Sequence, residues 1–439
     1  MVSVDERILS RIEGMRDEIL TTAGQLIQIE SVNPKYPGTE YADVVGGEGD
    51  AARFMGAIYK EMGGDLDLVT VESGRDNAVA TFAGTGQGRS LILNGHVDVV
   101  PVGDVADWSD GSPFSGRLQD GKIWGRGASD QKTGVVAQAM ALAAIRREGI
   151  KLRGDVIIEA VVGEEVMDHE AGVSATIERG YRADAAIVSE PTAPPPTLSV
   201  VPTSPGLLWF TVTVRGKASH SSVRDELIRA GGGGSRIAVN AIEKALGIVY
   251  ALQQLEQEWG ISKQHPLFRP GHFTIHPGVI SGGPHGVRVP FIISQICTIE
   301  YACWYNPDED VETVKTELAE HVHRACQLDS WLRENPAEIS WNLHWAPFVT
   351  SVEDKIVGAV ADAHQRANGD TAEVRGGSVA GFCAVCDATF LSKAGISTVV
   401  YGPGSILQAH TANEWVDAED VIKATRTFAL ATLDWCGVE

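Results

Sequence analysis

The sequence has little positive charge, few cysteines and no long hydrophobic run. Asp and Glu outnumber Lys and Arg by 58 to 36, which gives a formal net charge of −22 at pH 7. Because such a field repels polyanions, this balance argues against nucleic acid or an anionic membrane surface as a partner. No stretch approaches the 18 uninterrupted apolar residues of a membrane span, so we expect none. The first residues combine no basic segment with an apolar run, so we expect no secretory signal and a cytoplasmic location.

Six cysteines are too few for a disulfide framework in a chain of 439 residues. Only Cys383 and Cys386 have a suggestive spacing, but a metal knuckle would need a second Cys-x-x-Cys pair. A redox role would need a small thioredoxin-like unit, whereas this pair lies late in a large chain. We therefore predict free, apolar cysteines in a reducing compartment.

The composition, 44% hydrophobic and 21% charged, is that of a globular protein, and the length suits two domains. After a predicted amphipathic helix over 6–30, helices and short apolar strands alternate. We expect helices over 50–62 and 133–147 and strands over 91–93, 156–162 and 185–188. This alternation predicts an α/β domain with a mostly parallel sheet flanked by helices.

The pattern changes near Pro202 and returns after Pro347. Between them the sequence predicts an α+β set of elements: strands over 207–214, 273–281, 292–305 and 338–343, helices over 236–258 and 309–327, and a mobile loop over 216–235. After it we expect a helix from about 353, a strand over 398–401 and a final helix from 417. The chain is thus predicted to form one catalytic domain from 1–203 and 347–439, with a second domain, 204–346, inserted in it.

Polar groups follow the apolar strands at the points where the strands end. The groups are His96 and Asp98, Glu164 and Glu165, Glu190, His410 on the loop after 398–401, and Asp130 before the helix over 133–147. Because the carboxyl ends of parallel strands face one crevice, these side chains can converge. Histidine and carboxylate ligands without thiolates suit Zn²⁺, Co²⁺ or Mn²⁺. Five such ligands, His96, Asp130, Glu165, Glu190 and His410, are about right for two ions that share one carboxylate and a water.

Two further acids fit supporting roles. Asp98 lies two residues from His96, so on an extended backbone its carboxylate can accept the second imidazole N–H and fix the ring's orientation. Glu164 lies beside Glu165, and its carboxylate could take a proton from a metal-bound water and pass it to a leaving nitrogen. Glu164 could instead be a metal ligand, because sequence alone does not separate adjacent glutamates.

The motifs resemble those of a known family. They are Gly95-His-Val-Asp-Val-Val-Pro101, Gly125-Arg-Gly-Ala-Ser-Asp130, Gly163-Glu-Glu165, Ser189-Glu-Pro191 and Ala409-His-Thr411. In this order they resemble the family of acetylornithine deacetylase, succinyl-diaminopimelate desuccinylase, carboxypeptidase G and aminoacylase. The resemblance implies that Asp130 bridges two ions, one held by His96 and Glu190 and the other by Glu165 and His410. It also implies Glu164 as the general base, Asp98 as the orienting residue, and the inserted domain as a lid that dimerises.

The resemblance also implies a role for His220 in Gly216-Lys-Ala-Ser-His-Ser-Ser222, as the histidine that reaches a neighbouring subunit's active site and stabilises an oxyanion. A solvated loop histidine is the alternative. Where several members of the family have an arginine after Asp387-Ala388, this chain has Thr389. Recognition of a substrate carboxylate would then fall to Arg288 or Arg375, or be absent. Together with Asp387, these are our candidate substrate-binding residues.

We therefore predict a two-metal hydrolase that cleaves the C–N bond of a small N-acyl amino acid or peptide-like substrate through a metal-bound hydroxide. Zn²⁺ is the expected ion, with Mn²⁺ or Co²⁺ as alternatives, and a homodimer through the inserted domain is the expected assembly. Removal of an amino group from a small aromatic molecule is an alternative, because the apolar run 379–386 hints at an aromatic substrate. A catalytically inactive relative that only binds metal or ligand is the second alternative.

Overall fold

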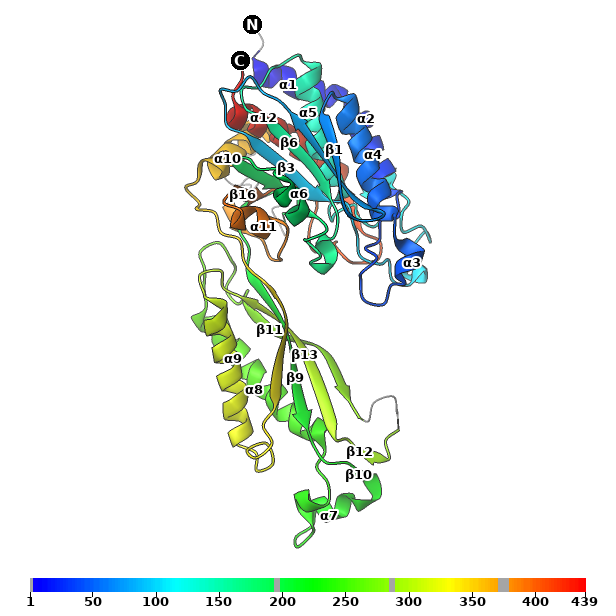
Figure 1. Ribbon diagram of the computed structural model, residues 1–439, viewed down its shortest axis with the longest axis vertical. Helices are drawn as coiled ribbons and strands as arrows, with labels where there is room; N and C mark the ends of the chain where they lie inside the picture. Colours follow the sequence, from blue (N-terminus) through cyan, green and yellow to red (C-terminus); the bar gives the residue numbers. More distant parts are fainter. Residues whose placement is uncertain (1–2, 193–197, 284–288, 370–378) are drawn as a thin grey trace. The chain divides into compact units, whose positions relative to one another are not determined.

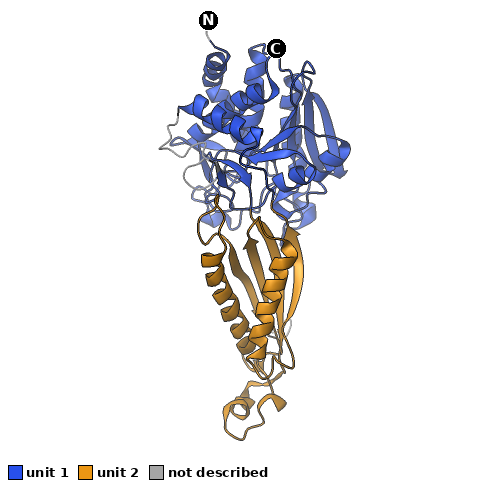
Figure 2. Cartoon of the chain, turned by 90° about the vertical axis from the view of Figure 1, so that its left-hand side faces the viewer, with its two compact units in different colours: residues 1–204, 348–439 blue, residues 205–347 orange. Residues whose placement is uncertain are grey.

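The computed structural model describes residues 3–192, 198–283, 289–369 and 379–439. The chain forms two compact units (Figure 2). Unit 1 comprises residues 1–204 and 348–439, and unit 2 comprises residues 205–347.

Unit 1 is built on an eight-stranded, mostly parallel sheet (Figure 1). The strands lie in the order β1 (Asp65–Glu72), β2 (Arg75–Phe82), β6 (Val156–Val161), β3 (Leu91–His96), β7 (Ala185–Val188), β16 (Ser397–Val400), β8 (Val200–Thr203) and β15 (Val379–Gly381). The central strands β6, β3 and β7 are parallel and buried along their whole length. Such strands are covered on both faces, which explains why the sequence shows them as continuous apolar runs. The predicted α/β fold class is confirmed.

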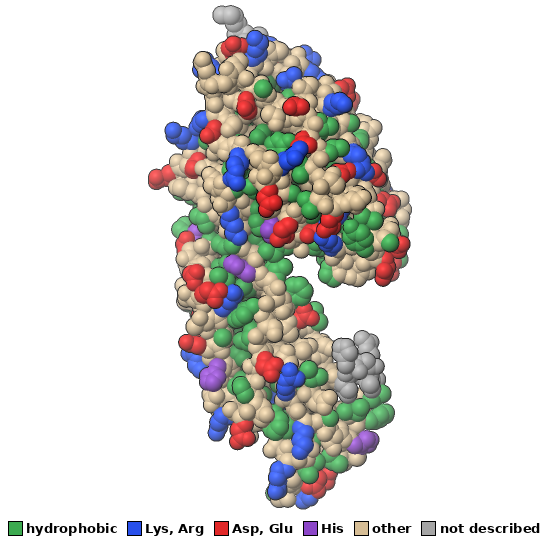
Figure 3. All heavy atoms as spheres, in the orientation of Figure 1, with side chains coloured by type: hydrophobic (Ala, Val, Ile, Leu, Met, Phe, Trp, Pro, Cys, Tyr) green, Lys and Arg blue, Asp and Glu red, His purple; other side chains and the backbone are tan. Residues whose placement is uncertain are grey.

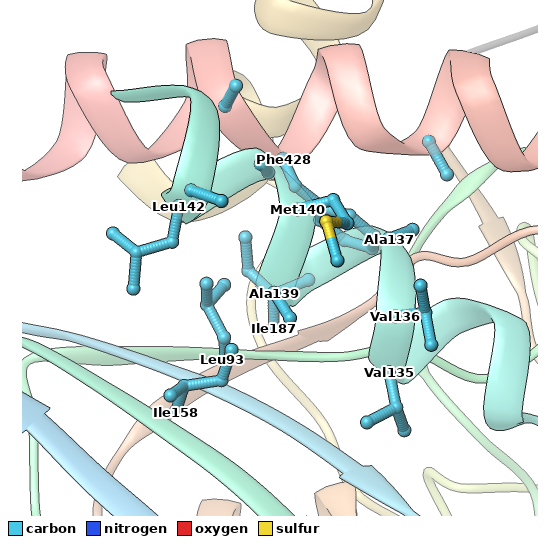
Figure 4. Close-up of a cluster of buried hydrophobic side chains, with 14 of the residues drawn as sticks. Leu93, Val135, Val136, Ala137, Ala139, Met140, Leu142, Ile158, Ile187 and Phe428 are labelled. Atoms are coloured by element: carbon cyan, nitrogen blue, oxygen red, sulfur yellow. The ribbon is translucent and has the colours of Figure 1, made fainter. Parts of the chain in front are cut away.

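The helices of unit 1 are α1 (Val4–Gly14), α2 (Arg16–Ile27), α3 (Tyr41–Val44), α4 (Gly47–Glu61), α5 (Lys132–Arg147), α6 (Val173–Arg179), α10 (Lys355–Asn368), α11 (Ala388–Lys393) and α12 (Ala418–Cys436). Of these, α4, α5, α6, α10, α11 and α12 contact the sheet. Figure 4 shows α5 between the sheet and α12, with Leu93, Ile158 and Ile187 of the strands beneath it and Phe428 of α12 above it. A small antiparallel sheet joins β17 (Trp415–Asp417), β5 (Lys122–Trp124) and β4 (Arg117–Gln119). Because α5 lies between the large sheet and α12, it is buried on nearly all sides, as its alanine-rich sequence indicates.

Unit 2 is an antiparallel sheet with two long helices. Its strands lie in the order β11 (Thr274–Gly282), β13 (Ile296–Tyr305), β9 (Gly206–Arg215) and β14 (Glu338–Trp345). The helices are α8 (Ala241–Ser262) and α9 (Val311–Gln327). Alternate residues of β9, among them Phe210 and Val212, are buried in one core with Ile248 and Leu318 of the two helices. The helices thus cover one face of the sheet, which makes unit 2 an α+β arrangement.

Several predicted elements were wrong in their extent. The helix predicted over 6–30 is two helices. Met15 lies between α1 and α2, and its backbone angles, φ −98° and ψ 3°, are not helical. The strand predicted over 292–305 divides into β12 (Ile292–Ile293) and β13. Between them the Ser294 hydroxyl donates a hydrogen bond to the carbonyl oxygen of Ile296, which interrupts the strand. The helix predicted from 236 begins only at Ala241. The side chain of the preceding Asn240 caps it by accepting a hydrogen bond from the backbone N–H of Ile242.

The segment predicted as a mobile loop over 216–235 contains short regular elements. They are β10 (Ser219–His220), which pairs with β12, and the helix α7 (Arg224–Ile228). The carboxylate of Glu226 accepts the backbone N–H of Gly233 and pairs with Arg229. Local hydrogen bonds of this kind order a glycine-rich segment that has no apolar periodicity to reveal it.

Two coarser predictions concern membrane spans and cysteines. None of the described helices is long and apolar enough to cross a membrane. None of the six cysteines is in a disulfide, as predicted, and all of them except Cys383 are buried. Acidic and basic side chains are interspersed over the face that Figure 3 shows.

Candidate active site

The candidate ligands of unit 1 lie at one edge of the sheet because of its strand pairing. His96 ends β3, and the parallel neighbours β6 and β7 end beside it. Glu164 and Glu165 follow β6, and Glu190 follows β7. The strand β16 is parallel to β7, so its following segment, which leads to His410, leaves the sheet at the same edge.

Asp130 lies between the two histidines. Its Oδ1 is 3.1 Å from Nε2 of His96, and its Oδ2 is 3.4 Å from Nε2 of His410. The loop before α5 that carries Asp130 turns at Gly127. This residue has a φ of +88°, and a Cβ at its position would lie only 2.9 Å from the Lys132 side chain, so the turn favours glycine. One carboxylate can therefore reach both ends of the site, as a bridging ligand must.

The other carboxylates complete two groups around these histidines. Oε1 of Glu190 lies 3.5 Å and Oε2 of Glu164 3.8 Å from Nε2 of His96. Oε2 of Glu165 lies 3.0 Å from Nε2 of His410. His96, Glu164 and Glu190, and likewise His96, Asp130 and Glu165, offer ligand atoms within 4.8 Å of one another. Glu164 therefore lies close enough to be either a ligand or a proton carrier.

Asp98 contacts different groups from those its spacing predicts. Nδ1 of His96 lies 2.9 Å from the backbone carbonyl oxygen of Asp98 and 3.6 Å from its carboxylate Oδ1. The buried Asp98 carboxylate instead accepts the backbone N–H groups of Glu164 (3.3 Å) and Glu165 (3.1 Å) and the side-chain N–H of Asn33 (2.8 Å). Asp98 thus orients the ring through its backbone, while its side chain fixes the segment that carries both glutamates.

Burial and mutual charge shift the protonation of these groups. Burial raises the pKa of Glu190 to about 8, and Asp130 adds to the shift while His96 opposes it. Burial likewise raises the pKa of Glu164 well above its ordinary value against the effect of His96. Burial acts to lower the pKa of His410, but Glu165 and Asp130 outweigh it and raise this pKa to about 12. These pKa shifts follow from burial and from the close approach of carboxylates and imidazoles in one site.

The residues present fit divalent cations. Oε1 of Glu165 is buried and has no hydrogen-bond partner among the described residues, and the buried Oε1 of Glu190 has only the long 3.5 Å contact to Nε2 of His96. A buried carboxylate oxygen without a partner is unfavourable unless a cation or a donor meets it. With two imidazoles and no thiolate, the donor set is one that Zn²⁺, Mn²⁺ or Co²⁺ accepts.

Sequence reasoning missed the buried groups that support the site. Arg75, fully buried, pairs with the buried Glu48 at 2.5 Å and with Asp168, three residues beyond Glu165. Glu414 and Arg126 form a second buried pair at 2.6 Å. Their partners are far apart in sequence, so spacing gave no signal for the contacts. A charged residue inside a matched motif, such as Arg126, was the one available signal.

Four predicted site residues remain, and the structure describes two of them, Asp387 and His220. Asp387 is buried at the start of α11, and its Oδ2 has no hydrogen-bond partner among the described residues. His220 lies in β10 of unit 2 and is exposed, with Nδ1 2.8 Å from the hydroxyl of Ser222. Arg288 and Arg375 lie outside the described residues.

A parallel sheet that gathers histidines and carboxylates at its strand ends around a buried glutamate defines a metal-assisted hydrolase. The sequence comparison agrees and is more specific. Residues 92–434 match peptidase family M20/M25/M40, and the chain belongs to this family. Enzymes of this family use divalent metal ions and hydrolyse amide bonds, so the predicted family resemblance and enzyme class are confirmed.

Named relatives match nearly the whole chain. The N-formyl-4-amino-5-aminomethyl-2-methylpyrimidine deformylase of Halalkalibacterium halodurans is 32% identical over 452 aligned positions, which cover 99% of this chain and 98% of the relative. The acetylornithine deacetylase of Myxococcus xanthus is 28% identical, with 93% and 94% covered. Among solved structures, human carnosine dipeptidase 1 is similar in fold, with a TM-score of 0.73, 15% identity and 99% of each chain covered.

Proposed function

We propose that this protein hydrolyses the amide bond of a small N-acyl amine, with an N-formyl aminomethylpyrimidine as the first candidate substrate. The observation that carries the reaction is the buried Glu164 carboxylate, 3.8 Å from the His96 ring in a cluster of candidate metal ligands. The full-length similarity to a protein named as a deformylase supports the substrate. This proposal changes the substrate expected from sequence, an N-acyl amino acid, and keeps the reaction.

In the proposed site the five predicted ligands would hold two divalent ions, Zn²⁺ or alternatively Mn²⁺ or Co²⁺. His96 and Glu190 would hold one ion, Glu165 and His410 would hold the other, and Asp130 is placed to serve both. Bound ions would polarise the substrate carbonyl and lower the pKa of the attacking water. This division is supported by the position of Asp130 between the two histidines.

Glu164 is the proposed proton carrier. Its carboxylate takes a proton from the attacking water while the water oxygen bonds to the carbonyl carbon. The same proton then passes to the nitrogen as the C–N bond breaks, which releases formate or another carboxylate and the free amine. Burial holds the pKa of Glu164 high, which suits a group that must both accept and return a proton.

The proposed aromatic substrate is supported by features around Asp387. Thr389 occupies the place where several family members have an arginine, so one means of binding a substrate carboxylate is missing. Burial is the main cause of the raised pKa of both Glu164 and Glu190, and the Asp387 carboxyl adds to both shifts. We propose that its unpaired oxygen accepts an N–H of the substrate amine. Arg288 and Arg375 stay predictions for a substrate that carries a carboxylate.

A substrate panel tests the proposal. The panel contains the N-formyl aminomethylpyrimidine, N-acetylornithine, other N-acyl amino acids, dipeptides and arylamines, each incubated with the metal-loaded protein. We expect the highest kcat/KM for the formyl compound. A preference for N-acyl amino acids or dipeptides would keep the reaction and overturn the substrate. Release of ammonia from an arylamine, without amide cleavage, would favour an aminohydrolase.

We further propose that unit 2 is a lid that mediates a homodimer of a cytoplasmic enzyme. Strand β11 lies at an edge of its sheet and exposes Val279 and Ile280 by 54% and 55%, and α8 exposes Tyr250 by 64%. An apolar strand edge of this kind is normally paired or covered. His220 would then reach the partner subunit's active site, as the family resemblance implies.

The dimer is checked by light scattering at micromolar concentration. We expect twice the monomer mass for the unmodified chain and a shift toward monomer for the double variant Ile280→Lys and Tyr250→Asp. Val105→Lys is the matched control, because Val105 is a 48% exposed apolar residue of unit 1. A monomer for the unmodified chain would contradict both the dimer and the role of His220.

A further inference from the structure

We propose that Glu414 is a positioning residue that holds two of the metal-ligand segments together, an inference that rests on the proposed metal site. Glu414 is fully buried, and its Oε1 accepts three backbone N–H groups of one loop. The donors are Gly127 at 3.1 Å, Ser129 at 2.8 Å and Asp130 itself at 3.2 Å. The backbone of the candidate bridging ligand is thus bonded directly to Glu414.

Glu414 also belongs to the segment of the other histidine. It lies four residues after His410, and its own carbonyl oxygen accepts the N–H of Gly125 at 2.9 Å. Immediately after it, β17 pairs with β5, with Trp415 opposite Trp124. The segment of His410 and the loop of Asp130 are therefore joined by the Glu414 side chain, its backbone and a strand pair in succession.

Arg126 extends this junction to a third segment. Its Nη1 donates to Oε2 of Glu414 at 2.6 Å and to the carbonyl oxygen of Thr411, the residue after His410, at 3.1 Å. Its Nη2 donates to the carbonyl oxygen of Pro101 at 3.4 Å. Pro101 ends the segment that begins with His96. The Glu414–Arg126 pair therefore contacts the segments of His96, Asp130 and His410, all three of which meet at the candidate site.

Because the Glu414–Arg126 pair contacts three ligand segments, it would set the positions of the metal ligands, which a general stabilising contact would not do. Asp130 has one oxygen toward each histidine, so a displacement of its loop would spoil the ligand set of both proposed ions. Ligand orientation by outer partners is worth roughly 10-fold to 100-fold in metal affinity. Glu414→Gln keeps the size of the side chain but replaces one oxygen with an N–H donor. Because all four groups around the carboxylate are donors, at least one of them must lose its acceptor.

The experiment is a Zn²⁺ titration of the full-length, chelator-stripped protein in competition with a chromophoric chelator. We expect Glu414→Gln to raise the Zn²⁺ Kd by about 10-fold or more. The matched control is Glu159→Gln, which changes another fully buried carboxylate of unit 1, one that accepts a side-chain N–H of Asn94. Melting of the metal-free variants measures the purely structural cost, and Glu159→Gln should show such a cost without a change of Kd beyond twofold.

Two results would overturn the inference alone, and a third would overturn the proposed function with it. If Glu414→Gln binds Zn²⁺ as tightly as the unmodified chain, Glu414 has no positioning role. If Glu159→Gln loses the same affinity, the loss reflects general destabilisation. If the unmodified chain binds no metal, the proposed function fails together with this inference. Should Glu414→Gln not fold, Arg126→Lys takes its place, with the same expected rise in Kd because the single Nζ of lysine cannot replace both Nη1, which bonds Glu414 and Thr411, and Nη2, which bonds Pro101.

Discussion

Glu164→Ala is expected to lower kcat by about 10³- to 10⁴-fold, the upper part of the range for general acid–base catalysis, with metal content unchanged. The physical reason is that Glu164 serves two steps, removal of a proton from water and its delivery to nitrogen. Its removal leaves the five proposed ligands intact. Folding should also be preserved, because burial disfavours the charged form of this carboxyl.

The neighbouring Glu165 supplies the matched comparison. Glu165→Ala removes the same chemical group one residue away but should lower the metal content, because Oε2 of Glu165 lies 3.0 Å from the His410 ring on the side of the second proposed ion. Metal stoichiometry by elemental analysis and turnover are measured for both variants. If Glu164→Ala loses metal and Glu165→Ala keeps it, the two roles are exchanged. If both keep metal and activity, the site lies elsewhere.

Asp130→Ala is expected to reduce the metal content from two ions per chain to less than one and to abolish activity. Both oxygens of Asp130 face a histidine, at 3.1 Å and 3.4 Å, so this variant removes a ligand from both proposed ions at once. It also removes a negative charge from between two candidate cation positions, which would increase their mutual repulsion.

The test compares elemental analysis of Asp130→Ala with that of Glu165→Ala after equal exposure to excess Zn²⁺. Because Glu165 contacts only one of the two proposed ions, its variant should keep about one ion per chain. Equal losses would argue against a bridging position for Asp130. Retention of two ions by Asp130→Ala would exclude it as a ligand. Circular dichroism of both variants separates loss of metal from loss of fold.

The sheet of unit 1 was predictable because its central strands are short, apolar and followed by polar residues. β3, β6 and β7 could be located this way, and parallel pairing then places His96, Glu164 and Glu190 at one edge. Element boundaries were less predictable where one side chain decides them. The hydrogen bond of Ser294 to Ile296 and the cap at Asn240 have no periodic signature in the sequence.

The support of the site could not be predicted for a different reason. Local spacing placed the Asp98 carboxylate on the His96 ring, but long-range packing brings the N–H groups of Glu164 and Glu165 to it instead. Glu414 is separated from the loop that it holds by more than 280 residues. Such contacts follow from the tertiary fold, so they become visible only when the strand order is known.

Metal dependence of amide hydrolysis tests the central claim most directly. The purified protein is analysed for metal, stripped with a chelator and refilled separately with Zn²⁺, Mn²⁺ or Co²⁺, and hydrolysis of the N-formyl aminomethylpyrimidine and of the acyl panel is measured at each stage. We predict that stripping abolishes hydrolysis and that refilling to two ions per chain restores it. Hydrolysis that persists after stripping, in a protein without detectable metal, would contradict the claim.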